Sequence, residues 1–487
     1  MSGPNETRPP FRFAAPALIA AVLVIALLGV AAHPNLPGCP AMSSSGATSP
    51  VQHVFFVVKE NHAFENYFGT YPGVVGDPPV GAFPASYGSN RTVGPFALNA
   101  SSTPDLPHDR TNLLAAVDGG RNDYFVAQAR WAGYAQPEDA LGYYTEKEIP
   151  VYFDLARNYS LADRFFSGVL GPTLPNRFFD LAATTGGWMT DGTAPPAVAS
   201  FPTILDQLSD AGVSWAYDYS GTRTYLAPLM FPSVYGDACR AERVQPLADL
   251  PAQLASPDPP AVTFIDPSTD SVYSEHPAQN VTLGSEWTAT VLHEIFQSPV
   301  AASSAVFLFF DEGGGFWDPV APPPVDAVGD GLRVPLLTIS PWTPAGSVTD
   351  APFDPAALLH FVDRNWGLPP LNDRVAQSAW PTDLFDFNRS PRAYVGPVAP
   401  LDFGTIAPSA TPSLLGPGHS PIEVLPAGSV APGASSAVSI GLHAGAADPR
   451  RSRVMRKWSP KAERGQRRPS QPSQRANVSK CRANFSA

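Results

Sequence analysis

Two pairs of side chains in this sequence have the composition of a ligand site, and each pair begins within two residues of the end of an apolar run. The first pair is Glu60 and Asn61, and the second is Asp311 and Glu312. Carboxylate and amide oxygens are the ligands that hard divalent cations take in proteins, so the first pair already looks like part of a metal site. Glycines after Glu312 would let the backbone turn sharply and approach a ligand closely. One polar strand end is ordinary because loops are polar, but two such pairs favour a functional interpretation.

A hydroxyl and an imidazole could supply the rest of a hydrolytic site. Thr173 lies between Pro172 and Pro175, which predicts a rigid turn. Its hydroxyl is a candidate nucleophile if a metal lowers its pKa, although a single threonine in a turn usually has no catalytic role. His276 could ligate a metal, donate a proton to a leaving group or stabilise transition-state charge. An ordinary surface histidine is an equally good interpretation from spacing alone.

Three apolar runs indicate the elements that would position these residues. Each is rich in β-branched and aromatic residues and lacks polar alternation, and the runs span residues 54–58, 261–265 and 305–310. Such runs are typical of strands that are covered on both faces in a parallel sheet. In open α/β sheets, ligands bind beyond the carboxyl ends of the strands. We therefore expect an α/β fold with the polar residues at that edge of the sheet, and a helix over residues 151–160.

Several longer segments together resemble the phosphoesterase family that contains bacterial phospholipases C and a class of acid phosphatases. They occur in the family's order over roughly residues 51–387: HVFFVVKENHAFENYFGTYPG, GYYTEKEIPVYFDLARNYSLADRFFSGVLGPTLPNR, EHPAQNVTLGSEW, FLFFDEGGGFWDPVAPPP and GLRVPLLTISPW. Long blocks in register are more specific than any single short motif. The resemblance implies an alkaline-phosphatase-like α/β fold, with a central, mostly parallel sheet flanked by helices. It also implies metal-assisted hydrolysis of phosphate esters by a serine or threonine nucleophile.

The resemblance further implies a role for each candidate residue. Thr173 would be the nucleophile and would form a phosphothreonine that water then hydrolyses. His276, and His108 in the sequence Pro-His-Asp, would contact phosphate oxygens or assist the leaving group. The cofactor would be a divalent metal ion of unknown identity, and its ligands would be Glu60, Asn61, Asp311 and Glu312. The substrate would be a phosphate ester, with phospholipids and phosphomonoesters both open.

Two departures from the family pattern concern residues near these positions. Asp318-Pro319 stands where the family commonly has Asp-His, and Ala63 and Glu65 flank Phe64 where a small polar residue and an aspartate are usual. Neither departure removes a candidate metal ligand, but both bear on substrate preference. The missing histidine supports an alternative function, a catalytically inert surface or envelope binding protein that keeps the fold. Sulfate or phosphonate hydrolysis is a further alternative, which the motif blocks favour less.

The amino-terminal part of the chain contains a candidate membrane segment. An apolar run at residues 13–32 follows Arg8 and Arg12, and no Lys or Arg occurs in the stretch directly after it. This asymmetry predicts that residues 1–12 are cytoplasmic and that the rest of the chain is outside. The length of the run favours an uncleaved membrane anchor, with a cleaved signal sequence and secretion as the alternative.

Composition divides the remainder of the chain. We expect a catalytic domain at 50–390, a Pro/Ala/Gly/Ser-rich linker at 391–449 and a basic, disordered tail at 450–487. The formal net charge is −12 although the tail holds 12 of the 31 Lys and Arg residues, so the catalytic domain is strongly acidic and is not expected to bind nucleic acid. No disulfide framework or cysteine metal site is indicated, because the cysteines are few and widely spaced: Cys39, Cys239 and Cys481.

Overall fold

Strand β1 (His53–Lys59) lies inside the central sheet, and all of its residues are buried. It pairs in parallel with β10 (Ser304–Phe310) on one side and with β9 (Val262–Asp266) on the other. These strands contain the three apolar runs of the sequence, whose lack of polar alternation reflects cover on both faces. The three predicted strands are therefore confirmed. The computed structural model of the chain describes residues 38–192, 199–222 and 226–407.

The central sheet has eight strands in the order β12-β6-β11-β10-β1-β9-β7-β8. Strand β11 runs antiparallel to both of its neighbours, and every other pair in the sheet is parallel. The sheet is thus mostly parallel, as predicted. Its remaining strands are β6 (Ser160–Ala162), β7 (Trp215–Tyr219), β8 (Val244–Pro246), β11 (Leu336–Ile339) and β12 (Ser347–Thr349).

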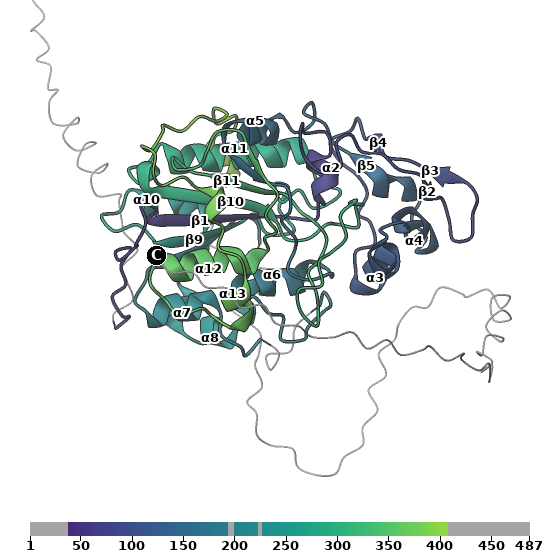
Figure 1. The fold of residues 1–487 in the computed structure, drawn as a ribbon. Coiled ribbons are helices and arrows are strands. Elements are labelled where there is room, and N and C mark those ends of the chain that lie inside the picture. Colours follow the sequence, from purple (N-terminus) through teal and green to yellow (C-terminus); the bar gives the residue numbers. More distant parts are fainter. Residues whose placement is uncertain (1–37, 193–198, 223–225, 408–487) are drawn as a thin grey trace, which may run out of the picture. The chain divides into compact units, whose positions relative to one another are not determined.

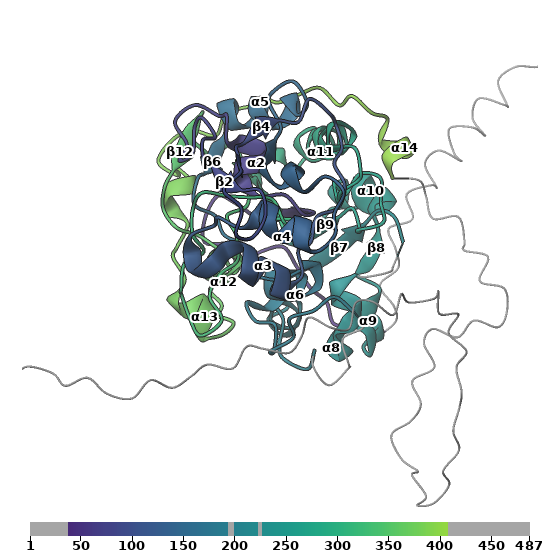
Figure 2. The same ribbon diagram turned by 90° about the vertical axis from the view of Figure 1, so that its right-hand side faces the viewer.

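Helices cover both faces of this sheet (Figures 1 and 2). On one face, α5 (Pro150–Asn158) contacts α11 (Val281–Phe296). On the other face, α6 (Thr173–Ala182) contacts α7 (Ile204–Asp210) and α12 (Pro355–Asn365). This layering confirms the predicted α/β class, and α5 is the helix expected near residues 151–160. Shorter helices are α8 (Pro232–Tyr235), α10 (Leu250–Leu254), α13 (Asp373–Gln377) and α14 (Phe403–Ile406).

A smaller group of elements lies beyond the carboxyl end of β1, on the right of Figure 1. It has its own hydrophobic core, which includes Leu113, Val126, Phe316 and Leu332. Because loops of this group surround the strand ends, it helps to position the residues that face them. Its elements are α3 (Arg110–Val117), α4 (Phe125–Trp131), β2 (Phe83–Pro84) paired with β3 (Thr92–Val93), and β4 (Phe96–Ala97) paired with β5 (Gly142–Tyr143). The short helix α2 (Phe64–Phe68) lies between β1 and this group and packs into the main hydrophobic core.

Cys39 and Cys239 form a disulfide, with their Cα atoms 5.5 Å apart. The expectation that the cysteines form no disulfide is therefore wrong. The bond joins the segment ahead of β1 to α9 (Ala238–Ala241), across a sequence separation of 200 residues. Such a separation leaves no local pattern from which the pairing could be predicted. The remaining cysteine, Cys481, lies outside the described residues.

Several predictions concern parts of the chain that the structure does not describe. The cytoplasmic segment at 1–12, the anchor or signal at 13–32 and the basic tail at 450–487 all lie outside the described residues. Within the residues that are described, no helix is both long enough and apolar enough to cross a membrane. Part of the predicted linker at 391–449 is described, and it includes α14, which contacts α11.

Candidate active site

The parallel pairing of β1 with β10 places the two predicted pairs of ligands side by side. Lys59 is in register with Phe310, so Glu60 and Asp311 follow at the same edge of the sheet. Both carboxylates are buried. The peptide N–H of Asn61 donates to Asp311 Oδ1 over 3.1 Å, which fastens one strand end to the other.

The glycine turn after Glu312 approaches Asn61 very closely. Asn61 has a φ of 60°, in the left-handed region that asparagine tolerates better than most residues. A Cβ added to Gly314 would lie 1.9 Å from the carbonyl oxygen of Asn61, and Gly314 also has a φ of 60°. Only glycine fits this position. The turn thus packs tightly against the backbone of Asn61, a candidate metal ligand, while its predicted approach to a bound ligand stays a prediction.

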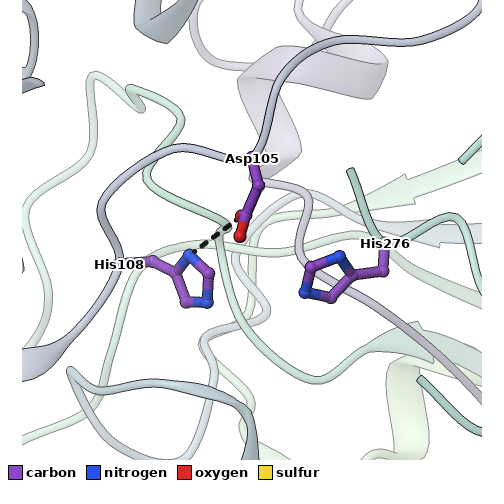
Figure 3. Close-up of side chains that lie close together, drawn as sticks. All are labelled: Asp105, His108 and His276. Carbon is purple, nitrogen blue, oxygen red and sulfur yellow. Dashed lines mark ion pairs between the residues drawn. The ribbon is translucent and has the colours of Figure 1, made fainter. Parts of the chain in front are cut away.

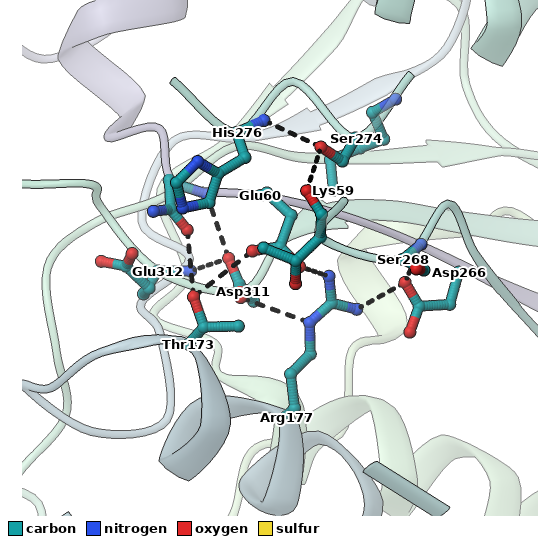
Figure 4. A network of polar contacts seen from close by, with 12 residues as sticks. Lys59, Glu60, Thr173, Arg177, Asp266, Ser268, Ser274, His276, Asp311 and Glu312 are labelled. Atoms are coloured by element: carbon teal, nitrogen blue, oxygen red, sulfur yellow. Dashed lines mark hydrogen bonds and ion pairs between the residues drawn. The ribbon is translucent and has the colours of Figure 1, made fainter. Parts of the chain in front are cut away.

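Thr173 is the first residue of α6, so the rigid turn predicted around it is the start of a helix. Pro172 and Pro175 are compatible with a helix here because the first turn leaves its N–H groups without partners inside the helix. The hydroxyl of Thr173 lies 3.3 Å from Glu60 Oε2 and 3.2 Å from Asn61 Oδ1. The structure therefore places the candidate nucleophile in contact with both Glu60 and Asn61. Figure 4 shows Thr173 beside Glu60.

Arg177 follows Thr173 by one helical turn and was not predicted. Its guanidinium forms ion pairs with acids at the ends of three neighbouring strands: with Glu60, with Asp311 at 3.2 Å and with Asp266 at 3.6 Å. All four side chains are buried, and they converge in Figure 4. The signal that could have found Arg177 is its spacing of four from Thr173, which puts both side chains on one face of a helix.

Negative charge exceeds positive charge around Arg177. Asp180, on the same helix, is buried, and neither of its carboxylate oxygens has a hydrogen-bond partner among the described residues. Burial raises the pKa of Asp311 and of Glu312 well above the usual range, and repulsion from neighbouring acids raises them further. A single guanidinium does not balance these carboxylates, so the site favours an additional cation.

The oxygens at this edge fit a hard divalent cation. Glu312 Oε2 accepts a hydrogen bond from Gly314 N over 2.7 Å, but Glu312 Oε1 is buried and has no hydrogen-bond partner in the described part of the chain. Leaving such an oxygen unsatisfied is costly, and a bound cation would satisfy it. The predicted ligands Glu60, Asn61, Asp311 and Glu312 all offer oxygen, the donor that Mg²⁺, Ca²⁺ and Mn²⁺ prefer.

His108 and His276 lie together beside these oxygens, with their ring centroids 6.1 Å apart (Figure 3). His108 Nε2 is 3.3 Å from the side-chain nitrogen of Asn61 and 3.9 Å from Glu312 Oε1. His108 Nδ1 lies 2.7 Å from the carbonyl oxygen of Leu106, which suits an N–H donor at that nitrogen. The structure thus brings both predicted histidines to the same side of the candidate site.

Asp105 joins the two histidines and was not predicted. Its Oδ1 is 3.4 Å from His108 Nδ1, and one ligand atom from each of Asp105, His108 and His276 lies within 4.8 Å of the others. Among the described residues, the acids Glu60, Asp311 and Glu312 do not converge as closely as this group. Arg177 donates to both Glu60 and Asp311, and the backbone N–H groups of Asn61 and Glu312 donate to Asp311.

The model of the Phosphoesterase family matches residues 51–369. This chain belongs to that family. Among its curated relatives, phospholipase C A of Mycobacterium tuberculosis is 28% identical, over 69% of this chain and 76% of the relative. Hemolytic phospholipase C of Pseudomonas aeruginosa is 27% identical, over 72% of this chain and 58% of the relative. The phosphoesterase described here is therefore a hydrolase that acts on phosphoester bonds, as the sequence predicted.

Solved structures similar to this phosphoesterase include two proteins of low sequence identity. One is a protein in the alkaline phosphatase superfamily from Vibrio parahaemolyticus, 11% identical, with a TM-score of 0.36 over 71% of this chain and 74% of the other. The second is the lipoteichoic acid synthase LtaP from Listeria monocytogenes, 9% identical, with a TM-score of 0.38 over 70% of this chain and 80% of the other.

One departure from the family pattern, Glu65, and the aspartate beside the other departure, Asp318, both pair with one buried arginine. Arg333 pairs with Glu65 at 3.1 Å, with Asp163 at 2.8 Å and with Asp318 at 2.9 Å. Burial and repulsion from Asp318 raise the pKa of Glu65 to about 8, against the opposing effect of Arg333. Glu65 and Asp318 are therefore partners in a buried charge cluster of their own.

Proposed function

We propose that this phosphoesterase uses Thr173 as its nucleophile and a divalent metal ion as its cofactor. The observation that carries the proposal is the position of the Thr173 hydroxyl, within 3.3 Å of Glu60 Oε2 and 3.2 Å of Asn61 Oδ1. The Thr173 hydroxyl thus contacts oxygens of two proposed metal ligands. A cation held by those oxygens would lie beside the hydroxyl and favour its ionisation. Asp311 and Glu312 would complete the ligand set.

In the proposed reaction, Thr173 Oγ1 gives its proton to solvent water and forms a bond to phosphorus, while the bond from phosphorus to the leaving ester oxygen breaks. His108 and His276 would contact the phosphoryl oxygens or give the leaving oxygen its proton. Water then attacks the phosphothreonine, which releases the phosphoryl product and restores the hydroxyl. A bound divalent ion would lower the pKa of the hydroxyl and offset charge on the phosphoryl oxygens.

We also infer that the catalytic domain is extracytoplasmic. The disulfide between Cys39 and Cys239 supports this location, because structural disulfides persist in oxidising compartments and are rare in the cytosol. The proposed anchor at residues 13–32 would hold the domain at the membrane, and its cleavage would release the domain instead. We propose that this catalytic domain spans residues 50–390.

The proposed substrate is a phosphate ester, with phospholipids as one candidate class because the curated relatives include phospholipases C. The test is an assay of the full chain on a phosphatidylcholine analogue and on an aryl phosphate, each with and without a chelator. We expect turnover of at least one substrate, its loss with chelator and its recovery with a divalent metal ion. A folded protein that turns over neither substrate with any divalent metal would contradict the proposal and favour an inert binding protein.

A further inference from the structure

Asp191 lies beside the proposed nucleophile and has no role in the reaction described above. Its Oδ1 accepts a hydrogen bond from the backbone N–H of Leu174 over 2.9 Å, and Leu174 directly follows Thr173 at the start of α6. Free N–H groups at the start of a helix attract anions, including phosphoryl groups. The Asp191 carboxylate therefore already accepts the hydrogen bond of the amide next to Thr173, the residue that would carry the phosphoryl group.

The same carboxylate faces the rest of the candidate site. Burial raises the pKa of Asp191, while the Leu174 N–H and both histidines, His108 and His276, act in the opposite direction. Asp191 thus lies within electrostatic reach of His108 and His276.

Asp191 also forms part of the wall of a cavity beside Thr173. The cavity has a volume of about 620 Å³, and its lining includes Asp105, His108, Tyr134 and Pro172. Asp109 and Arg110 line it too, but the guanidinium of Arg110 donates to the carbonyl oxygen of Leu170 over 2.7 Å. Acids therefore outnumber bases in the lining. The cavity has room for a substituent attached to the phosphoryl group.

The charge of the phosphoryl group differs between the two candidate substrate types. A phosphomonoester carries close to two negative charges at neutral pH and above, because its second pKa is near 6. A phosphodiester carries one. A fixed carboxylate next to the phosphoryl site therefore repels the monoester more strongly than the diester.

We propose that Asp191 is a specificity-determining residue that favours monoanionic phosphodiesters over dianionic phosphomonoesters, with the second ester substituent in the cavity beside Thr173. This inference rests on the proposed function, since it assumes that Thr173 receives the phosphoryl group. It assigns the choice of substrate class to one carboxylate rather than to the shape of the cavity alone.

The test is Asp191→Asn in the full chain. Asparagine keeps an oxygen that can accept the Leu174 N–H, so the helix start is preserved and only the charge is removed. The kcat/KM is measured at pH 8 for the monoester p-nitrophenyl phosphate and for the diester methyl p-nitrophenyl phosphate. Both substrates release the same p-nitrophenol. We expect the monoester-to-diester ratio of kcat/KM to rise about tenfold, and the inhibition constant of inorganic phosphate to fall by a similar factor.

Asp109→Asn is the matched control, because it removes the same charge from the lining of the same cavity. The Asp109 carboxylate caps α3, where it accepts from Thr111 N over 2.9 Å and from Asn112 N over 3.1 Å. We expect this variant to change the ratio by less than about threefold. An unchanged ratio in Asp191→Asn, or an equal change in both variants, would overturn the inference while leaving the proposed function intact. Full turnover in Thr173→Ala would instead overturn the proposed function, and the inference with it.

Discussion

Arg177 Nε donates a hydrogen bond to Asp311 Oδ2 over 3.2 Å, and both side chains are buried. The same guanidinium also holds Glu60 Oε1, so one residue of α6 fixes an acid at the end of β1 and another at the end of β10. A planar fork of donors can hold two carboxylates in fixed orientations, which an ammonium group cannot do. Arg177 is therefore a positioning residue for two of the proposed metal ligands.

The substitution Arg177→Lys tests this relationship, because it keeps the charge and loses the fork. We expect metal affinity, measured by isothermal titration calorimetry, to fall about 10- to 100-fold, as for other losses of groups that orient metal ligands. Circular dichroism should still report a folded protein. Asp266→Asn removes a partner of Arg177 that is not a proposed ligand, and it should alter the affinity much less. Equal metal affinity in wild type and Arg177→Lys would refute the positioning role.

Glu312→Gln should raise the stability of the metal-free protein and lower its affinity for metal. In the metal-free protein, the substitution removes a buried carboxylate whose Oε1 has no hydrogen-bond partner, so the melting temperature at pH 8 should rise by about 2–4 °C. With metal present, the loss of a charged ligand should weaken binding at least about tenfold. Thermal melts with and without a divalent ion measure both effects. A variant that binds metal as tightly as wild type would exclude Glu312 from the ligand set.

The disulfide should contribute strongly to stability. Replacing Cys39 and Cys239 by serine should lower the free energy of unfolding by about 2–5 kcal/mol, because the unfolded chain then regains the freedom that a cross-link over 200 residues removes. Urea denaturation of the full chain measures the change. Thiol titration of the denatured, unreduced wild type should find one free thiol per chain, that of Cys481. Three free thiols in protein made in an oxidising compartment would contradict the pairing.

Asp218 should lower the stability of the folded wild-type protein as the pH rises. Burial raises its pKa to about 8, although hydrogen bonds from Gln253 and Gln245 oppose the shift. The folded state therefore binds a proton that the unfolded state releases from about pH 4 upwards, so stability from this group falls as pH rises from about 4 to about 8. Asp218→Asn should raise the melting temperature at pH 9 by about 3 °C or more and should have little effect at pH 4. An equal shift at both values would show that proton binding is not the cause.

The sequence correctly predicts that polar residues after β1 and β10 lie close together, because strand ends in a parallel sheet share an edge. Glu60 and Asp311 meet there for that reason. Arg177 escapes prediction because the prolines around Thr173 suit a turn as well as the start of a helix. Asp191 was missed because it lies in a polar loop with no pattern, and its place beside Leu174 depends on the folded chain. The antiparallel strand β11 and the disulfide depend in the same way on long-range packing.

In the proposed mechanism, Thr173 is the residue that receives the phosphoryl group. The decisive measurement is rapid acid quenching of the full chain during turnover of an aryl phosphate, followed by mass spectrometry of the peptide that contains residue 173. We expect a phosphate on Thr173, and neither labelling nor turnover in Thr173→Ala, while Thr173→Ser keeps both. Undiminished turnover in Thr173→Ala, or a phosphate found on another residue instead, would contradict the proposed mechanism.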